Sequence, residues 1–185
     1  MYPGHGIIIR SLFKAGLLWL ALILFSACSG PTILEPVAND SRIVRLAAVG
    51  DIMLGTDFPK DTLPPDDLNI LANVTPVLRQ ADITFGNLEG VLLDGGEPSK
   101  KCKTLSACYL FRTPTRYASR LKEAGFNVMS LANNHARDFG EQGRDSSMQA
   151  LSSLGIQHSG RIGDVASWQV KGLKVAMIAF APFGN

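Results

Sequence analysis

The sequence has few of the features that mark zinc-binding or nucleic-acid-binding proteins. It contains three cysteines and three histidines among 185 residues, and no pair of them has zinc-finger spacing. The formal net charge is only +2, and no basic patch is interleaved with aromatic side chains, so no nucleic-acid partner is expected. Charged residues make up 18% of the chain and hydrophobic residues 46%, which excludes an intrinsically disordered protein. The length predicts one domain.

The longest apolar run lies near the N-terminus and is too short to span a bilayer comfortably. It covers the 13 uncharged residues Ala15–Ala27 and follows the basic residues Arg10 and Lys14, as in an export signal. A transmembrane anchor is the alternative, but it would have to include Ile7 to Ile9 and both charges. Removal of residues 1–27 would lower the formal net charge from +2 to zero, because both basic residues would leave.

The apolar run ends at a cysteine. Its last residues, Leu24-Phe-Ser-Ala-Cys28, resemble the bacterial lipoprotein cleavage box, with Phe25 where that box usually carries Leu. The resemblance implies that Cys28 is the lipidated first residue of a mature chain; the alternative is a chance cysteine inside the signal. We therefore expect a membrane partner through lipidated Cys28, in the cell envelope and facing the periplasm or the exterior. The expected order is a signal peptide over residues 1–27, a tether over 28–42 and a folded domain over 43–185.

The other two cysteines, Cys102 and Cys108, are close together in the sequence. Disulfides persist outside the cytoplasm, so an exported chain favours a bridge between them. Such a bridge would close a short loop and would pin that loop rather than stabilise the whole domain. The alternative is two unpaired thiols.

Short apolar runs alternate with helical patterns along the chain. The spacing of Leu68, Leu71, Val74 and Leu78 predicts a helix, which Pro76 either kinks or delays. Thr113-Pro114 predicts a helix start, Gly125 its end, and Gly155 the end of a helix that contains Met148 and Leu151. Strands are expected at residues 43–49, 81–85, 109–111, 128–132 and 156–159, followed by a hairpin of 168–170 and a buried strand 173–180. This order predicts an α/β fold with a mixed sheet.

Polar side chains follow three of these strands at the point where each strand ends. Ligands and substrates of α/β folds bind there, because the carboxyl ends of neighbouring parallel strands share one edge of the sheet. Oxygen and imidazole groups of this mix suit a divalent metal such as Mn, Fe, Zn or Mg. Turn formation, helix capping and solvated surface charge are the alternative roles of the single residues. The residues concerned are Asp51, Asn87, Glu89, Asn133, Asn134, His135 and Asp138.

Four segments in order resemble the bacterial capsule-synthesis, poly-γ-glutamate-biosynthesis CapA family, which is related to the calcineurin-like metallophosphoesterases. They are Ala48-Val-Gly-Asp-Ile-Met-Leu-Gly55, Ala81-Asp-Ile-Thr-Phe-Gly-Asn-Leu-Glu-Gly90, Phe111-Arg-Thr-Pro114 and Leu131-Ala-Asn-Asn-His-Ala-Arg-Asp-Phe-Gly140. The resemblance runs from about Arg45 to Phe180. It implies a metallophosphatase-like β-sandwich flanked by helices, of which this chain would be the N-terminal part, truncated at its C-terminus.

The resemblance also implies roles for individual residues. Asp51 matches a metal ligand, Glu89 lies where the superfamily has a metal-bridging aspartate, and Asn134 matches an asparagine ligand. His135 matches the histidine that assists the leaving group, while Asn87, Asn133 and Asp138 would contact substrate or support the ligands. Two departures weaken the implied activity: Met53 stands where the phosphoesterase motif has a histidine, and the later histidine motifs are absent from the sequence.

Two functions remain open at this point. The first is a metal-dependent phosphoesterase-like hydrolase that acts on a phosphoester or an anionic exopolymer in capsule or poly-γ-glutamate metabolism. The second is a non-catalytic lipoprotein that binds such a polymer or scaffolds a synthase complex. An inert fragment with an uncovered sheet edge is a third, weaker alternative.

Overall fold

The computed structural model describes residues 42–101 and 108–182. The predicted signal peptide, nearly all of the tether and the lipidation site Cys28 lie outside these residues, so those predictions remain untested. Cys108 is disulfide-bonded. Cys102 lies outside the described residues, so the pairing of the two stays a prediction. The compact unit runs over Asp40–Asn185.

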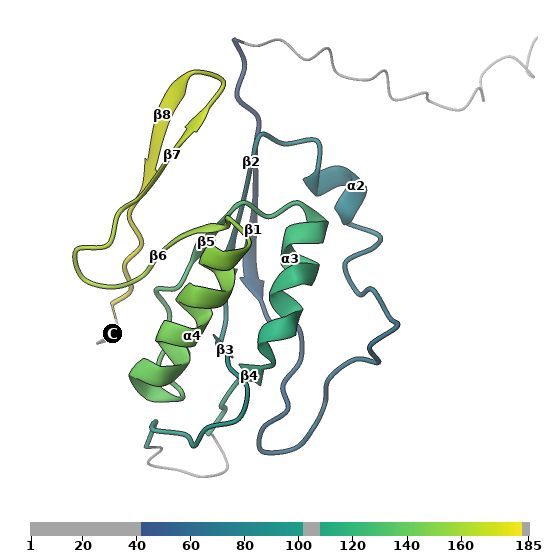
Figure 1. Cartoon of the computed structure of the whole chain (residues 1–185), viewed down its shortest axis with the longest axis vertical. Helices are drawn as coiled ribbons and strands as arrows, with labels where there is room; N and C mark the ends of the chain where they lie inside the picture. The colour runs from purple at the N-terminus through teal and green to yellow at the C-terminus, as the bar shows by residue number, and fades with distance from the viewer. Residues whose placement is uncertain (1–41, 102–107, 183–185) are drawn as a thin grey trace, which may run out of the picture. The chain divides into compact units, whose positions relative to one another are not determined.

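The centre of the fold is a parallel four-stranded sheet with the order β1-β2-β5-β6 (Figure 1). Its strands are β1 (Leu46–Ile52), β2 (Ile83–Leu88), β5 (Val128–Ser130) and β6 (Gln157–Ser159). All three pairings are parallel, which confirms the α/β class. The predicted mixed sheet is wrong, because the antiparallel pairing among the described residues belongs to a separate hairpin.

The register of this sheet aligns the strand ends that carry polar residues in the sequence. Asp51 is paired with Asn87, Asn87 with Ser130, and Ser130 with Ser159. Paired residues of neighbouring parallel strands point to the same face, so these four form one row across the sheet. A bulge in β1 between Ala48 and Asp51 shifts the register. Without that shift Asp51 would not stand opposite Asn87, since a one-residue slip reverses the face of every side chain.

Helices connect the strands and cover one face of the sheet. They are α2 (Thr75–Leu78), the 3-10 helix η2 (Thr115–Tyr117), α3 (Ala118–Ala124) and α4 (Gly140–Ser153). Figure 1 shows α3 and α4 side by side on the same face. Pro76 stands in the first turn of α2, so the predicted late start is the observed one. Gly125 ends α3 with a φ of 105°, a left-handed conformation that glycine adopts without strain.

The main core lies between this helical layer and the sheet. Its members include buried side chains from β1, β2, β3 (Val91–Leu92), β5, α2, η2, α3 and α4, with Tyr117, Leu121, Met129 and Leu151 at 0% exposure. Burial of each such side chain contributes roughly 2 kcal/mol to folding. This core fixes the helix-side residues of the strands and therefore leaves the row of Asp51 and Asn87 on the opposite side.

Two further pairs of strands lie beside the main sheet. β3 (Val91–Leu92) pairs in parallel with β4 (Arg112–Thr113). The expected strand over residues 109–111 is wrong, because the pairing begins one residue later, at Arg112. The loop that follows β1 is tied to β4, since the Arg112 guanidinium bonds Asp57 at 2.6 Å.

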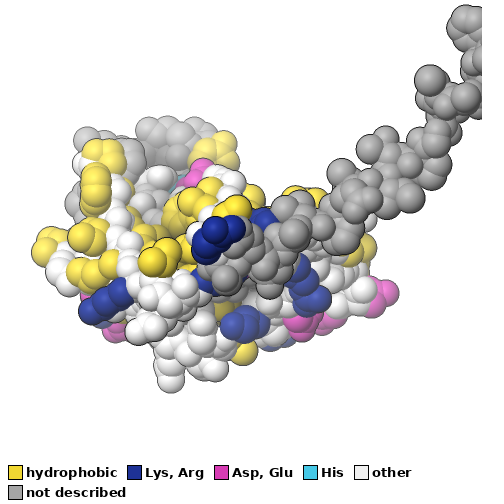
Figure 2. All heavy atoms as spheres, turned by 90° about the horizontal axis from the view of Figure 1, so that it is seen from above, with side chains coloured by type: hydrophobic (Ala, Val, Ile, Leu, Met, Phe, Trp, Pro, Cys, Tyr) yellow, Lys and Arg dark blue, Asp and Glu magenta, His cyan; other side chains and the backbone are white. Residues whose placement is uncertain are grey.

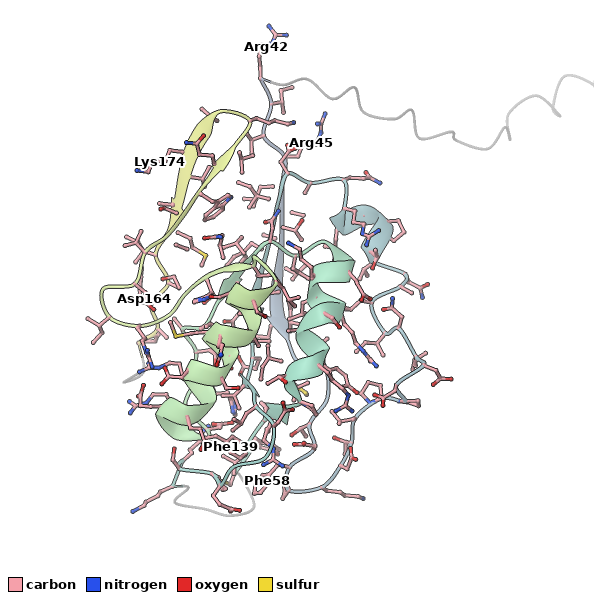
Figure 3. All side chains as sticks on the ribbon, in the orientation of Figure 1. Arg42, Arg45, Phe58, Phe139, Asp164 and Lys174 are labelled. Carbon is pink, nitrogen blue, oxygen red and sulfur yellow. The ribbon has the colours of Figure 1, made fainter. Side chains whose placement is uncertain are left out.

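Aromatic packing fixes the same corner of the fold. Phe58 and Phe139 meet edge to face with ring centroids 5.4 Å apart, and both are labelled at the lower end of the molecule in Figure 3. The Arg112 guanidinium lies 5.3 Å and 5.2 Å from these two rings, so one cation contacts both.

The hairpin of β7 (Ala166–Val170) and β8 (Leu173–Met177) forms as predicted, with Lys171-Gly172 as its turn. The prediction that its second strand is buried is wrong. Leu173, the first residue of β8, is 56% exposed, and none of the five residues of β8 is buried. Hydrophobic side chains gather on this end of the molecule in Figure 2. Separately, none of the helices within residues 42–101 and 108–182 has the length and apolar character that crossing a bilayer requires.

Candidate functional site

The candidate site is a chain of hydrogen bonds at the carboxyl ends of β1 and β2. The Asn87 side-chain amide nitrogen donates to Asp51 Oδ1 at 2.8 Å and to Glu89 Oε2 at 3.2 Å. Asp51 is exposed, whereas the Glu89 side chain is 15% exposed. The sheet register produces this arrangement, since Asp51 and Asn87 are paired and Glu89 follows β2 by one residue.

Asn133 joins this group to the segment that follows β5. Its side-chain nitrogen donates to Asn87 Oδ1 at 3.1 Å and to the Leu88 carbonyl at 2.8 Å, and its oxygen accepts the His135 backbone N–H at 3.0 Å. Asn133 is buried, with 6% exposure. It therefore acts as a connector that holds His135 beside the ends of the strands.

His135 is oriented by a buried carboxylate. Its Nδ1 lies 2.7 Å from Asp138 Oδ2, while its Nε2 lies 3.6 Å from Glu89 Oε1. Because a carboxylate accepts, Nδ1 carries the hydrogen in this contact and Nε2 faces Glu89. Asp138 is fully buried and also accepts the Phe111 backbone N–H at 2.8 Å.

Two residues that contact His135, Lys100 and Phe111, are not among the predicted site residues. The Lys100 ammonium lies 2.9 Å from Asp138 Oδ1 and 3.4 Å from His135 Nδ1, and the Phe111 ring stacks on the imidazole with centroids 4.4 Å apart. Lys100 belongs to a polar loop with no strand or motif to single it out. Phe111 stands in one of the four family-like segments, and that position was the available signal.

The environment of Glu89 shifts its titration. Burial is the main cause that raises its pKa above the usual glutamate range, and the Asp51 carboxylate adds to the rise. His135 and the hydrogen bond from Asn87 oppose the shift in the pKa. A raised carboxyl pKa beside a histidine in one polar cluster is typical of a functional site, although ion-pair networks produce it too.

The remaining predicted site residue, Asn134, lies at the surface. Its side chain is exposed, and its main-chain carbonyl accepts a hydrogen bond from Lys100 at 3.2 Å. Met53, two residues after Asp51, is 47% exposed. The structure thus gathers Asp51, Asn87, Glu89, Asn133, His135 and Asp138 into one network and leaves the Asn134 amide outside it.

Some oxygen and nitrogen atoms of the network are of the kinds that bind metal ions. Asp51 and Glu89 each place a carboxylate oxygen around the same Asn87 nitrogen, so the two carboxylates converge on one point. Hard divalent cations prefer such oxygen ligands. Within the described residues, however, no group of three or more His, Cys, Asp or Glu side chains is arranged to hold a metal. Two converging carboxylates could contribute ligands to one cation and are too few for two.

An apolar pocket of about 470 Å³ adjoins the network at Asp51. The pocket lies between the end of β1 and the turns around α2, and its apolar lining includes Val49, Met53, Ile70 and Val74. These four side chains are between 36% and 47% exposed, so the pocket opens to solvent.

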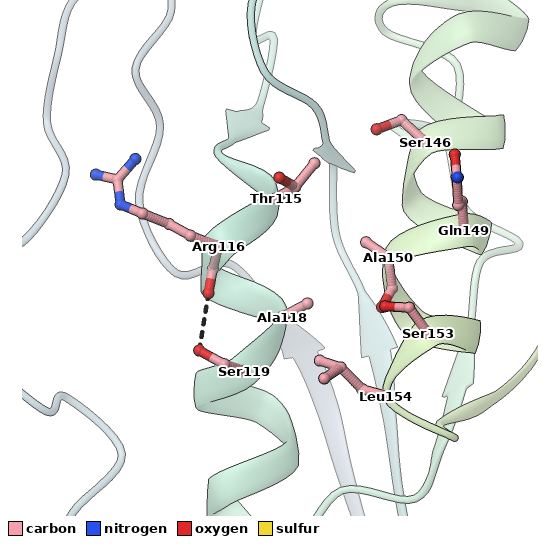
Figure 4. A pocket seen from close by; sticks show the side chains of 9 residues that line it. All are labelled: Thr115, Arg116, Ala118, Ser119, Ser146, Gln149, Ala150, Ser153 and Leu154. Carbon is pink, nitrogen blue, oxygen red and sulfur yellow. Dashed lines mark hydrogen bonds between the residues drawn. The ribbon is translucent and has the colours of Figure 1, made fainter.

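A second pocket of about 470 Å³ lies between η2, α3 and α4 and shares no lining residue with the network (Figure 4). Hydroxyl, amide and small apolar side chains line it, and Ser119 Oγ donates to the Arg116 carbonyl at 2.9 Å within it. Its one charged residue, Arg116, pairs with Asp66 at 3.2 Å. This pocket therefore offers little chemistry of its own.

Known proteins are similar to much of this chain. The family model described as "Bacterial capsule synthesis protein PGA_cap" matches residues 45–184. "Capsule biosynthesis protein CapA" of Bacillus anthracis is 26% identical over 148 residues, which cover 77% of this chain and 36% of that protein. "PGA biosynthesis protein CapA" of Bacillus subtilis (strain 168) is 28% identical over 147 residues, covering 75% and 37%.

An "Uncharacterized protein y4sH" of Sinorhizobium fredii is 31% identical over 119 residues, covering 62% of this chain and 24% of that protein. The chain thus spans between about a quarter and somewhat over a third of the length of these relatives. The family match covers most of the described fold and every residue of the network. The chain belongs to the bacterial capsule synthesis protein family PGA_cap.

Proposed function

We propose that this CapA-like protein acts in capsule or poly-γ-glutamate-type exopolymer metabolism as a metal-dependent phosphoesterase-like hydrolase. The observation that supports this most is the hydrogen-bonded path from Asp51 through Asn87 and Asn133 to His135. It brings two carboxylates and an oriented imidazole to the ends of adjacent strands, which is where α/β folds bind ligands. The metallophosphatase-like sandwich and the lipid anchor in the envelope are parts of the same proposal.

The residues divide the work between binding a cation and moving a proton. Asp51, Glu89 and Asn134 would hold one divalent cation, which when bound activates water and neutralises charge on phosphoryl oxygens. Asp138 fixes the His135 ring through Nδ1, so Nε2 faces the strand ends. As an imidazolium, with a second proton on Nε2, His135 can pass that proton to the oxygen that leaves, a contribution of roughly 10²–10⁴ in rate.

The test is turnover of a phosphodiester such as bis(p-nitrophenyl) phosphate by the full-length chain with added Mn²⁺. We expect His135→Ala to lower kcat at least a hundredfold and Asp51→Ala to lower bound Mn²⁺ together with turnover. His158→Gln is the matched control, because His158 contacts Ser152 and lies outside the network. Turnover that persists in both variants would contradict the proposed hydrolase activity.

A second candidate is a non-catalytic protein that binds an anionic polymer or scaffolds a synthase. The specific observation in its favour is the pair of departures at the site: a thioether, Met53, beside Asp51, and no group of three metal-holding side chains in the described parts of the chain. This candidate predicts polymer binding that persists after His135→Ala and after EDTA treatment. The hydrolase predicts that EDTA abolishes turnover.

A further inference from the structure

The orientation of the Asn133 amide is fixed by backbone partners of known polarity. Its nitrogen faces the Leu88 carbonyl at 2.8 Å, which can only accept, and its oxygen faces the His135 N–H at 3.0 Å, which can only donate. A flipped amide would set donor against donor and acceptor against acceptor. Because Asn133 is 6% exposed, water could not repair those contacts easily.

This fixed amide in turn orients Asn87. The remaining hydrogen on the Asn133 nitrogen points to Asn87 Oδ1 at 3.1 Å, so Asn87 must present its oxygen there. Its NH₂ group therefore faces the other way, toward Asp51 and Glu89. Both of its hydrogens are used, one on each carboxylate.

The Asn87 nitrogen thus stands where a cation shared by the two carboxylates would stand. A cation bound by Asp51 and Glu89 together must displace it. If Asn87 turned over to offer its oxygen as a ligand, its nitrogen would meet the Asn133 nitrogen, and the bond between the two amides would be lost. The geometry leaves Asn87 as a donor to the carboxylates and excludes it as a metal ligand.

We infer that Asn87, locked by Asn133, competes with the divalent cation for Asp51 and Glu89 and so sets the metal affinity of this site. The inference rests on the proposed function for the presence of a cation, and it adds the residue that limits its binding. If Asn87 were a metal ligand, its replacement by alanine would weaken metal binding. If Asn87 competes with the metal, the same replacement strengthens metal binding.

The experiment measures Mn²⁺ binding by isothermal titration calorimetry and by electron paramagnetic resonance, with wild-type, Asn87→Ala and Asn87→Asp full-length chains. Asn87→Ala removes the competing N–H groups without changing charge, and we expect it to tighten Mn²⁺ binding about threefold to tenfold. Asn87→Asp places a third carboxylate at the same point, and we expect at least tenfold tighter binding. Asn69→Asp is the control for added charge, because exposed Asn69 accepts the Leu71 N–H through Oδ1 and an aspartate keeps that bond.

Each outcome decides something. Weaker binding by Asn87→Ala would show that Asn87 is a ligand and would overturn the inference while leaving a metal enzyme in place. If both Asn87 variants bind Mn²⁺ and the wild type binds none, that result would support the inference and would count against the proposed hydrolase activity. Failure of wild type and both variants to bind would overturn both. If Asn87→Asp unfolds in EDTA, we expect added Mn²⁺ to restore its circular dichroism spectrum. If it stays unfolded in Mn²⁺ as well, the Mn²⁺ affinity of Asn87→Ala decides.

Discussion

Asp138 shows at the scale of one residue how burial and pairing combine. Its side chain is completely buried; Oδ2 contacts two donors, the Phe111 N–H and His135 Nδ1, and Oδ1 forms an ion pair with the Lys100 ammonium. A buried carboxylate is tolerated only with such partners, because desolvation of an unpaired charge costs several kcal/mol. The residue is thus both a structural requirement and the support of the His135 ring.

Asp138→Asn should therefore destabilise the fold by about 3 kcal/mol, since it removes the charge that compensates Lys100 and misorients the imidazole. Urea unfolding followed by circular dichroism measures this loss. Asp145→Asn is the matched control: it removes an exposed ion pair with Arg161, which should cost under about 1 kcal/mol. Equal losses for the two variants would contradict the assigned role of burial.

His158 gives the fold a dependence on pH. Burial lowers its pKa below the usual histidine value of 6.5, with the nearby Asp164 opposing the shift. The unfolded chain then binds more protons than the folded one just below pH 6.5. By linkage, stability is full above that pH and falls as the pH drops through the lowered folded value.

His158→Gln should remove this contribution, so the loss of stability as the pH falls below 6.5 becomes shallower than in the wild type. Guanidinium unfolding at pH 7.5 and pH 5 measures it. Identical pH dependence in both chains would exclude His158 as the source.

Some residues of the network carry a signal in the sequence and others do not. Strand ends carry a pattern, so Asp51, Asn87, Glu89 and His135 could be singled out from the order of residues alone. Lys100 could not, since its place beside Asp138 depends on how its loop folds back. The segment around Lys100 gives no periodic or motif signal, and loops take their course from tertiary contacts.

At the scale of elements, one asparagine joins the starts of two strands. Asn127 Oδ1 accepts the Thr84 N–H at 2.9 Å, and its nitrogen donates to the Asp82 carbonyl at 2.9 Å. These bonds extend the pairing of β2 and β5 beyond the strands themselves.

Asn127→Ala should cost about 2 kcal/mol, because it leaves a buried N–H and a carbonyl without their partners. Hydrogen exchange should show the Thr84 amide losing protection first. Gln142→Ala, at an exposed position on α4, is the control and should change stability by less than about 0.5 kcal/mol.

The turn after β2 depends on a glycine. Gly90 has a φ of 101°, and a Cβ there would lie 2.7 Å from Phe111 Cβ. Gly95 has a φ of 74°, and a Cβ added there would meet nothing within 4 Å, so it isolates the cost of the backbone conformation.

Gly90→Ala should therefore destabilise by about 3 kcal/mol and Gly95→Ala by about 1 kcal/mol, the difference being the clash with Phe111. Thermal unfolding of both variants gives the comparison. A smaller effect at Gly90 than at Gly95 would be incompatible with the packing described.

For the whole molecule, the sequence pattern was enough to predict the parallel strands and their helical layer. It was not enough to predict the residues at which each strand and helix begins and ends. Apolar runs and the glycine stops located β1, β2, β5, β6 and α3, since period and caps are local signals. α4 begins at Gly140, well before the apolar positions that indicated it, because its first turns carry polar and small residues. The predicted burial of β8 was wrong because burial depends on what lies opposite a strand.

The exposed apolar side chains in β8 and directly after it should promote self-association, since exposed apolar groups attract one another. Leu173→Gln combined with Ile178→Gln should raise the protein concentration at which oligomers appear by about threefold or more. Sedimentation velocity measures it. Ile162→Gln, at a 98% exposed position before the hairpin, is the control and should leave that concentration nearly unchanged.

The tip of the hairpin is fastened to the first residues of the fold. The Lys171 ammonium donates to the Ile43 carbonyl at 2.8 Å and pairs with Asp82 at 2.9 Å. A chain that folds as it leaves the ribosome can build β1 and β2 early, but this clasp must wait until the later segment emerges. Until the hairpin has been synthesised, the first residues of the fold therefore lack their contacts with Lys171.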